Sequence, residues 1–295
     1  MNAPTKREDL SGVDLVAEIE RLKKERNAII LGHYYQKPEI QDLSDFVGDS
    51  LELSRKAAET DAEVIAFCGV KFMAETAKIL SPEKTVILPD MNAGCSLEDS
   101  CPPNKFRAFR EKHPDHIALT YINCSAEVKA LSDIIVTSSS AETIIAQIHE
   151  DQKIIFGPDR HLGGYMARKF GREMLLWPGV CIVHEAFSET ELLKLKEQRP
   201  GAPIAAHPEC PPDVVAEADF SGSTSGIIDY VHREKPAKAM LVTECSMASN
   251  IADELPEVDF VGPCNMCPYM KKITLEKVLW SLHTMSGAVE VEAEV

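Results

Sequence analysis

Three short segments decide the fold of this 295-residue chain: IILGHYY at residues 29–35, IALTYIN at residues 117–123 and IAAHPE at residues 204–209. Each is an apolar run that passes directly into polar residues. A hydroxyl side chain follows 15 residues after the end of each segment: Ser50, Ser138 and Thr224. A cysteine then closes each unit, and successive cysteines lie 86 residues apart: Cys95, Cys181 and Cys267. Because these landmarks recur in one order, the chain contains three copies of one structural unit.

The segments between these landmarks predict the secondary structure. A second apolar run follows in each unit, at 64–67, 154–156 and 239–242, and a third run ends near a proline: Pro89, Pro178 and Pro263. After a first helix that ends near Arg26, helical periodicity is found in seven segments: 51–59, 72–80, 106–112, 141–149, 189–197, 227–232 and 273–283. Short strands that alternate with helices are typical of parallel sheets covered by helices.

The sequence therefore predicts an α/β fold. We expect three repeated small α/β domains, with parallel sheets flanked by helices, around a pseudo-threefold axis. The predicted domains are residues 1–112 with an N-terminal helix, residues 113–200, and residues 201–295 with a C-terminal helix.

Composition limits the class of protein. Hydrophobic residues make up 44% of the chain and charged residues 26%, as in ordinary globular proteins. The net charge of -16 disfavours nucleic acid or an anionic membrane surface as a partner. No apolar stretch is long enough to cross a bilayer, and residues 1–10 lack the apolar core of a signal peptide, so we expect a cytoplasmic protein. In that reducing compartment, nine cysteines predict ligands or buried thiols in place of a disulfide framework.

The three hydroxyls lie in turns rich in glycine, serine and threonine, beyond predicted strands. In parallel sheets, ligands bind at the carboxyl ends of strands, beside the N-termini of the following helices. Such a turn offers backbone N–H groups and the positive end of a helix dipole to an anion, worth roughly 1 kcal/mol or more when partly buried. One such residue alone is more often a helix cap. Recurrence at a fixed offset favours anion binding by Ser50, Ser138 and Thr224.

Six polar side chains stand where the first strands end: His33, Tyr35, Tyr121, Asn123, His207 and Glu209. A single histidine or tyrosine in such a place is usually structural, but six in register are candidates for proton transfer and hydrogen bonding. Glu209 is the only carboxylate among them and is therefore the best candidate for a general base.

The cysteines indicate a cofactor. We expect buried thiols at Cys68, Cys101 and Cys245, whereas Cys124 and Cys210 fit either a cavity mouth or a packed core. A CxxC pair at residues 264–267 fits zinc or a redox disulfide when taken alone, but the 86-residue spacing selects its second member. Three thiolates without a fourth indicate an iron–sulfur cluster with one iron left open as a Lewis acid.

Several motifs resemble those of the quinolinate synthase family and keep that family's order. They are GHYYQ (32–36), VGDS (47–50), FMAETA (72–77), TYIN (120–123), TSS (137–139), PDR (158–160), HPEC (207–210), GST (222–224) and CPYM (267–270).

The resemblance implies three similar α/β domains around a central 4Fe-4S cluster with one open iron, held by Cys95, Cys181 and Cys267. It also places nine side chains in the active site: His33, Tyr35, Ser50, Tyr121, Asn123, Ser138, His207, Glu209 and Thr224. The implied reaction joins iminoaspartate to dihydroxyacetone phosphate, with loss of phosphate and two waters, and forms quinolinate for de novo NAD biosynthesis. It also implies a functional link to an enzyme that produces iminoaspartate.

Two other classes of protein fit part of the pattern. An electron-transfer or redox-sensing iron–sulfur protein would need the cluster but not the hydroxyls and proton-transfer groups. A zinc-dependent sugar-phosphate isomerase or hydrolase would leave the cysteines incidental. Metal analysis after anaerobic purification separates these classes, because a 4Fe-4S protein carries about four irons and four sulfides per chain.

Overall fold

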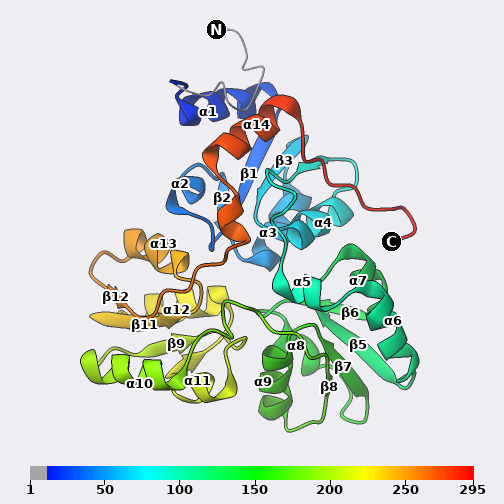
Figure 1. Cartoon of the computed structure of the whole chain (residues 1–295), viewed down its shortest axis with the longest axis vertical. Coiled ribbons are helices and arrows are strands. Elements are labelled where there is room, and N and C mark those ends of the chain that lie inside the picture. Colours follow the sequence, from blue (N-terminus) through cyan, green and yellow to red (C-terminus); the bar gives the residue numbers. More distant parts are fainter. Residues whose placement is uncertain (1–11) are drawn as a thin grey trace. The chain divides into compact units, whose positions relative to one another are not determined.

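The computed structural model describes residues 12–295 and has three four-stranded parallel sheets flanked by helices (Figure 1). The first sheet contains β1 (Ala28–His33), β2 (Phe46–Gly48), β3 (Val64–Cys68) and β4 (Thr85–Ile87). The second contains β5 (His116–Tyr121), β6 (Ile134–Val136), β7 (Lys153–Gly157) and β8 (Leu175–Leu176). The third contains β9 (Ile204–Ala206), β10 (Phe220–Ser221), β11 (Lys238–Val242) and β12 (Asp259–Val261). Each sheet has the same strand order, second-first-third-fourth, so the predicted α/β class and its threefold repetition are confirmed.

An aspartate fixes the first strand of every repeat. Its carboxylate accepts a hydrogen bond of 2.7 to 2.8 Å from a strand N–H 15 residues earlier, and its own N–H donates to the carbonyl oxygen of the same residue. The pairs are Ile30 with Asp45, Ala118 with Asp133, and Ile204 with Asp219. All three strand residues are fully buried, so these bonds satisfy backbone groups that water does not reach. We call these pairs the aspartate clamps.

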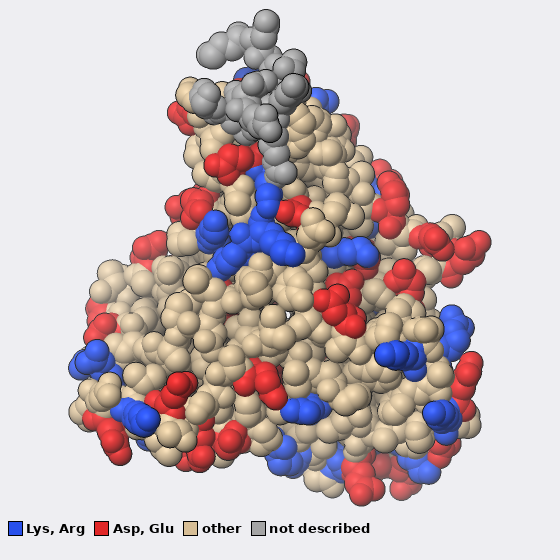
Figure 2. Space-filling model, in the orientation of Figure 1, with Lys and Arg blue, Asp and Glu red and all other residues tan. Residues whose placement is uncertain are grey.

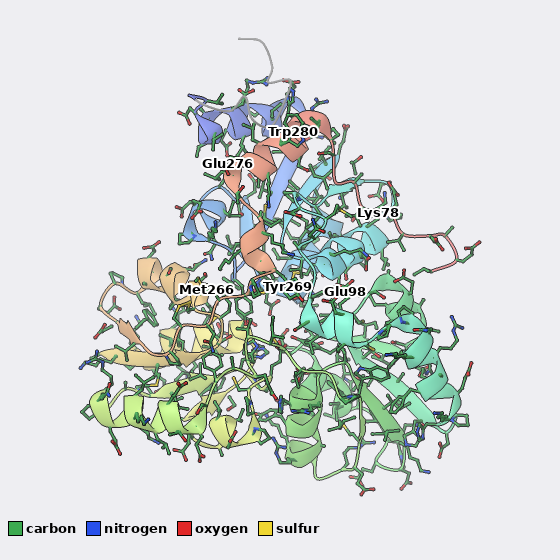
Figure 3. All side chains as sticks on the ribbon, in the orientation of Figure 1. Lys78, Glu98, Met266, Tyr269, Glu276 and Trp280 are labelled. Atoms are coloured by element: carbon green, nitrogen blue, oxygen red, sulfur yellow. A yellow bond between two sulfur atoms is a disulfide. The ribbon has the colours of Figure 1, made fainter. Side chains whose placement is uncertain are left out.

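Contacts divide the described chain into two compact units. The first unit joins residues 12–94 to Pro268–Val295, and α1 (Leu15–Glu25) packs against α14 (Leu275–Thr284). Glu276 and Trp280 lie on α14 (Figure 3). Lys277 Nζ pairs with Asp90 Oδ2 at 2.5 Å, which ties α14 to the loop after β4. The C-terminal segment is therefore held against the first sheet by an ion pair as well as by packing.

Polar side chains define where the helices of the first unit begin. Asp14 caps α1 by accepting a hydrogen bond from Ala17 N at 3.1 Å. Asp49 and Glu52 form a capping box at the start of α3 (Ser50–Glu59). Two further helices complete this unit, α2 (Pro38–Gln41) and α4 (Lys71–Leu80), together with a 3-10 turn at Met270–Lys272.

The second unit, Cys95–Cys267, contains the other two sheets. Its helices are α5 (Ser96–Ser100), α6 (Pro103–Glu111), α7 (Ala126–Ala130), α8 (Ala141–Ile145), α9 (Arg160–Phe170), α10 (Glu189–Gln198), α11 (Pro212–Ala216), α12 (Thr224–Glu234) and α13 (Ser246–Glu254). One apolar core packs Phe106 and Trp177 against Ile155 of β7, and the other packs Ile204 against Met240. Tyr165 on α9 donates a hydrogen bond of 3.4 Å to the carbonyl oxygen of Ser221, so the two repeats of this unit touch.

Within residues 12–295, one predicted helix is shorter than expected, and six observed helices were not predicted: α2, α5, α7, α9, α11 and α13. The helix expected over 141–149 ends at Ile145, because the N–H groups of Gln147 and Ile148 bond to carbonyls three residues back and break the α-helical pattern. Helix α9 was not predicted, since Gly163 and Gly164 lower the helical propensity of that segment. A Cβ at Gly163 would lie 2.7 Å from the Phe156 ring, so this glycine allows α9 to approach β7 closely.

The surface carries charges of both signs. Figure 2 shows Lys and Arg side chains interspersed with Asp and Glu over much of the viewed face, apart from one cluster of basic residues. Within residues 12–295, no helix combines the length and the apolar character needed to span a membrane.

Candidate active site

The predicted site residues follow the ends of strands. His33 and Tyr121 are the last residues of β1 and β5, and His207 follows β9 directly. The hydroxyls come after the second strand of each repeat, and the cysteines after the fourth. Because parallel strands end at one edge of a sheet, each repeat gathers its polar residue and its hydroxyl at the edge where ligands bind in such folds.

Glu209 is the centre of a buried polar cluster in the second unit. Its side chain is only 3% exposed, and Oε2 lies 2.9 Å from His184 Nδ1. Tyr121 donates a second side-chain hydrogen bond to the same carboxylate. The rings of His184 and His207 stack with centroids 4.8 Å apart. The structure thus brings three predicted site residues together: Tyr121, His207 and Glu209.

The surroundings keep Glu209 ionised. Burial raises the pKa of this carboxyl group, but the positive charges of His184 and His207 and the hydrogen bonds from His184 and Tyr121 outweigh burial. The result is a pKa of about 2. Glu209 is therefore a buried carboxylate held in its ionised form.

Asp159 is a second carboxyl group in this cluster, and its environment raises its pKa where that of Glu209 is lowered. It is fully buried, Oδ1 caps α9 by accepting a hydrogen bond from Leu162 N at 2.7 Å, and Oδ2 has no hydrogen-bond partner. Burial and the charge of Glu209 raise the pKa of Asp159 well above its usual range, against the effect of nearby backbone N–H groups. The environments of these two carboxyl groups thus shift their pKa values in opposite directions.

His184 joins the carboxylate to a cysteine. Its Nδ1 lies 3.2 Å from Cys181 Sγ as well as 2.9 Å from Glu209, and its Nε2 lies 3.0 Å from Thr243 Oγ1. The side chain is 2% exposed, so these contacts fix the ring on both edges. His184 was missed in the sequence because it has no counterpart in the other repeats. The available signal was its spacing of three residues from Cys181.

Hydrogen bonds bring the segments of the three register cysteines together. Ser96 Oγ donates to the carbonyl oxygen of Val180 at 3.3 Å and accepts from Ile182 N at 3.1 Å, which joins the residue after Cys95 to both neighbours of Cys181. Asn265 Nδ2 donates to the carbonyl oxygen of Val183 at 3.4 Å, which brings the segment of the third cysteine to the same place.

A buried glutamate orients the third cysteine. Glu244 follows β11 and is fully buried. Its Oε1 accepts a hydrogen bond from Cys267 N at 3.1 Å, and its Oε2 accepts one from Ser246 N at 2.8 Å. Glu244 was also missed in the sequence, because nothing local marks a carboxylate that bonds to a backbone group 23 residues away.

The register thiols are half-buried and affect one another electrostatically. Burial raises the pKa of Cys95 well above its usual range, and the charge of Cys267 raises it further against nearby N–H groups. Burial likewise raises the pKa of Cys181, followed by the charges of Glu209 and Cys95. Negative charges on these sulfur atoms oppose one another, and a shared cation would stabilise them. The donor set of three soft sulfur ligands fits an iron–sulfur cluster.

The remaining cysteines are structural. Cys68 and Cys101 are buried thiols, as predicted, and burial raises the pKa of each to about 12. Cys124 and Cys210 lie inside apolar cores, so packing is the correct one of the two alternatives left open.

The prediction of a free buried thiol at Cys245 is wrong. Cys245 forms a disulfide with Cys264, with the Cα atoms 5.0 Å apart. A parallel bridge between Glu244 and Asn265 aligns the two backbones at this point, so the thiols meet. Cys267, the other member of the CxxC pair, takes no part in this disulfide.

Helix N-termini carry two of the predicted hydroxyls. Ser50 and Thr224 are the first residues of α3 and α12, and in both helices the preceding residue is the cap: Asp49 and Ser223. Ser138 lies in the turn between β6 and α8 and is half-buried. Ser50 and Thr224 are therefore not the caps of these helices, which was the alternative to the predicted anion binding.

The other predicted site residues lie at equivalent strand ends. Asn123 follows β5 and its buried Oδ1 has no hydrogen-bond partner. In the first unit, His33 Nδ1 accepts a hydrogen bond from Tyr35 N at 3.0 Å, and the two rings meet edge to face at 4.7 Å. Lys271 Nζ donates to the carbonyl oxygen of Tyr35 at 2.6 Å, so the C-terminal segment supports this turn.

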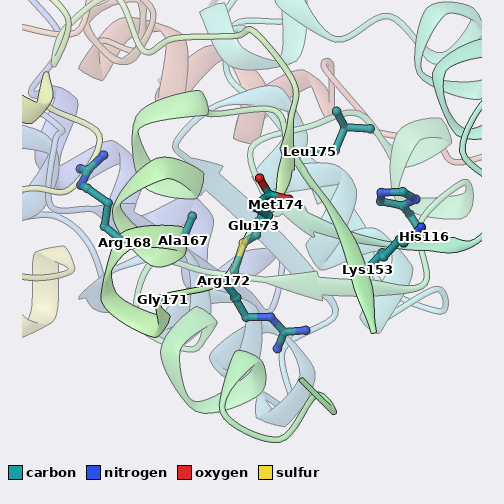
Figure 4. A pocket seen from close by; sticks show the side chains of 9 residues that line it. All are labelled: His116, Lys153, Ala167, Arg168, Gly171, Arg172, Glu173, Met174 and Leu175. Atoms are coloured by element: carbon teal, nitrogen blue, oxygen red, sulfur yellow. The ribbon is translucent and has the colours of Figure 1, made fainter. Parts of the chain in front are cut away.

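A surface pocket of about 770 Å³ lies at the opposite edge of the second sheet (Figure 4). His116 and Lys153, the first residues of β5 and β7, line it together with the end of α9 and residues 171–175. Lys153 is paired with Asp115 at 2.6 Å, and Arg172 donates to backbone carbonyl oxygens of residues 148–152. None of the predicted site residues lines this pocket, so we do not assign the active site to it.

Comparison with known proteins identifies a family. The model of the quinolinate synthetase A protein family matches residues 17–295. A quinolinate synthase of Chloroherpeton thalassium is 55% identical over 92% of this chain and 86% of the relative. A quinolinate synthase of Prochlorococcus marinus is 50% identical over 99% of this chain and 88% of the relative, and one of Synechocystis is 53% identical over 94% and 89%.

Proposed function

The chain belongs to the quinolinate synthetase A family, and from this premise we propose that it condenses iminoaspartate with dihydroxyacetone phosphate. The product is quinolinate, and phosphate and two waters leave. The single observation that carries this proposal is the buried carboxylate of Glu209, which is held by His184 and Tyr121 beside the thiol of Cys181. The reaction needs proton transfer, and Glu209 would accept protons beside Cys181, a residue that would hold the cofactor that assists loss of hydroxyl.

The cofactor of this proposal is a 4Fe-4S cluster on Cys95, Cys181 and Cys267, with one iron not bound by the protein. When bound, such a cluster supplies a Lewis-acidic iron that assists the loss of a hydroxyl group. Two buried side chains orient the ligands: Glu244 holds the backbone of Cys267, and His184 contacts the sulfur of Cys181. Fixed ligands reduce the cost of assembling the site.

Glu209 accepts the protons that leave carbon and nitrogen during isomerisation and ring closure. Its low pKa and its contact with His184 keep it unprotonated and oriented between turnovers. His207, stacked on His184, assists proton transfer. Asp159 stays protonated beside Glu209, so the buried cluster holds a proton that is available for donation.

The substrates carry two carboxylates and one phosphate, and the three hydroxyls are proposed to bind these anions. Ser50 and Thr224 stand at the first positions of α3 and α12, where backbone N–H groups and the helix dipole favour negative charge. Ser138 lies in the equivalent turn of the second repeat. These local groups offset the overall charge of -16, which would otherwise oppose the binding of anions.

Further residues orient the substrates. Asn123 has a buried, unbonded Oδ1 that can accept a hydrogen bond from a substrate N–H or hydroxyl group. Tyr121 donates to Glu209 and therefore fixes the base, in addition to contacting substrate. His33 and Tyr35, which lie edge to face at the end of β1, are proposed to supply further orientation and proton transfer.

The proposed setting is the cytoplasm, as a step of de novo NAD biosynthesis. Iminoaspartate is an imine that water hydrolyses, so the enzyme that produces it must act close in time and space. The proposed partners are thus two small-molecule substrates and a functional link to that enzyme, with neither nucleic acid nor membrane involved.

Anaerobic reconstitution with iron and sulfide, followed by an assay for quinolinate from the two substrates, tests the proposal. We expect about four irons and four sulfides per chain and turnover that depends on both substrates. A reversible redox potential without quinolinate formation would favour an electron-transfer protein instead. Zinc in place of iron after anaerobic purification, with sugar-phosphate isomerisation or hydrolysis, would favour the zinc enzyme.

A further inference from the structure

Three metal-binding atoms converge in the buried cluster independently of the other two register cysteines. They are the Sγ atom of Cys181, the Nδ1 atom of His184 and a carboxylate oxygen of Glu209, and all lie within 4.8 Å of one another. The distance from Sγ to Nδ1 is 3.2 Å, and the distance from Nδ1 to Oε2 is 2.9 Å. In a tetrahedral zinc site, bonds of about 2.0 to 2.3 Å place neighbouring ligand atoms roughly 3.3 to 3.6 Å apart. The two distances to Nδ1 are close to this range, and the third, from Sγ to the carboxylate oxygen, is at most 4.8 Å, so side-chain movements of about 1 Å or less would open a site for one ion.

The donor types select the kind of ion. A thiolate, an imidazole and a carboxylate are the three ligands that zinc takes in proteins, and zinc sites with three protein ligands keep a fourth position for water. Magnesium and calcium prefer oxygen ligands only, so they do not match this set. The geometry selects a divalent ion of the zinc type, for which cobalt is a spectroscopic substitute.

The surroundings resemble the support that metal ligands receive in proteins. A metal-bound histidine usually donates its second ring N–H to another group, and His184 Nε2 lies 3.0 Å from Thr243 Oγ1. Tyr121 holds Glu209 in the same way. The side chains of His184 and Glu209 are 2% and 3% exposed, so water would not reach these two ligands of a bound ion.

Charge also favours an ion in this place. The carboxylate of Glu209 and the sulfur of Cys181 lie against the same ring nitrogen of His184, at 2.9 and 3.2 Å, so a thiolate in this place would face a like charge at short range. A divalent cation bound to one thiolate and one carboxylate gives a neutral site. Binding forms bonds from the ion to sulfur, nitrogen and oxygen, and the thiol proton is released to solvent without any redox change.

We propose that the cluster-free protein binds one zinc-type divalent ion through Cys181, His184 and Glu209. Nothing in the proposed reaction requires this ion, and the site goes beyond the proposed function. The ion occupies one cluster ligand and the proposed base, so zinc and the cluster exclude each other. Zinc binding thus prevents cluster assembly until the ion is removed.

Anaerobic titration of cluster-free protein with Co²⁺ tests the site. We expect one Co²⁺ per chain, a thiolate-to-cobalt charge-transfer band in the near ultraviolet, and displacement of Co²⁺ by an equal amount of Zn²⁺. Cys95→Ala should prevent cluster assembly but keep the cobalt band. His184→Ala should lower the cobalt affinity by about 10- to 100-fold or more, and Thr243→Val by about 10-fold.

Controls distinguish ion binding from loss of structure. His232 is a more exposed histidine of the same unit, paired with Glu254 at 2.9 Å, so His232→Ala should leave the cobalt affinity unchanged. Far-ultraviolet circular dichroism checks the fold of each variant. Because Glu209→Gln removes only the charge, it provides a second ligand variant that keeps the side-chain shape, and it too should weaken the band.

Two results would overturn the proposal. The first is a cobalt band that is absent from wild type or that survives in His184→Ala at unchanged affinity. The second is full cluster assembly in protein that still retains stoichiometric zinc. Quinolinate formation by the iron-loaded wild type, measured on the same preparation, tests the proposed function separately, because neither cobalt result alters it.

Discussion

Replacing Glu209 by Gln removes the negative charge and keeps nearly the same shape. The wild-type carboxylate takes part in charge-assisted contacts with His184 and Tyr121 in a buried site. Hydrogen bonds to charged groups contribute about 1.5 to 3 kcal/mol and neutral ones about 0.5 to 1.5 kcal/mol. Two such changes therefore predict a loss of about 2 to 3 kcal/mol in the free energy of unfolding of cluster-free protein, measured in urea.

The effect on activity should be larger than the effect on folding. A positioned general base contributes typically 10²- to 10⁴-fold to a rate, which corresponds to roughly 3 to 5 kcal/mol of activation free energy. We expect the reconstituted Glu209→Gln enzyme to keep about four irons per chain and to lose at least 100-fold in kcat. The readouts are iron and sulfide content together with steady-state formation of quinolinate.

The matched control is Glu217→Gln, the same substitution at a carboxylate that is 29% exposed and pairs with Lys196 at 3.2 Å in the same repeat. Exposed ion pairs contribute little, so this variant should stay within about 1 kcal/mol of wild type and keep full activity. A Glu209→Gln enzyme that turns over at the wild-type rate would refute the role of Glu209 as the base. A variant with normal kcat but a raised KM would show instead that Glu209 binds substrate.

Three further predictions concern the cofactor and the packing of the C-terminal segment. Cys181→Ala should abolish cluster assembly, and iron analysis that finds a fully loaded cluster would contradict its role as a ligand. Glu244→Gln should weaken the hydrogen bond that orients Cys267 and should slow cluster assembly without changing the fold. Reconstitution kinetics and circular dichroism measure the two effects, and unchanged kinetics would refute this positioning role. Asp90→Asn should lower the free energy of unfolding by about 1 to 2 kcal/mol, because it breaks the ion pair with Lys277. An unchanged free energy of unfolding would show that packing alone holds α14. Burial raises the pKa of Asp90, but the hydrogen bond from Lys277 outweighs burial and holds this pKa below its ordinary value. The ion pair therefore stabilises the fold fully above pH about 4, and this stabilisation is lost as pH falls through the lower folded pKa. Unfolding measured as a function of pH detects the loss.

The repeat made much of the site predictable. Tyr121, His207 and Glu209 were identified because a strand end is a fixed place in an α/β repeat, and the structure brings them into one cluster. Register alone separated Cys267 from its CxxC neighbour, since the chain offered two candidate thiols within four residues.

The residues that were missed act through contacts between distant parts of the chain. His184 and Thr243 have no counterpart in the other repeats, so the repeat pattern could not identify them. The disulfide of Cys245 with Cys264 depends on a strand pairing that brings residues 19 apart into contact, and composition had argued against it. The packing of α14 on α1 joins the two ends of the chain, and a local pattern contains no information on such a contact.

The aspartate clamps allow the opening of each sheet to be followed by hydrogen exchange. Each clamp ties up one strand amide of its own repeat, at Ile30, Ala118 and Ile204, through a carboxylate on a loop of that repeat. Exchange of these three amides with deuterium therefore reports the opening of each sheet separately. A ligand that stiffens one repeat should slow exchange at its own clamp first, so three backbone positions would map where in the chain a bound molecule acts.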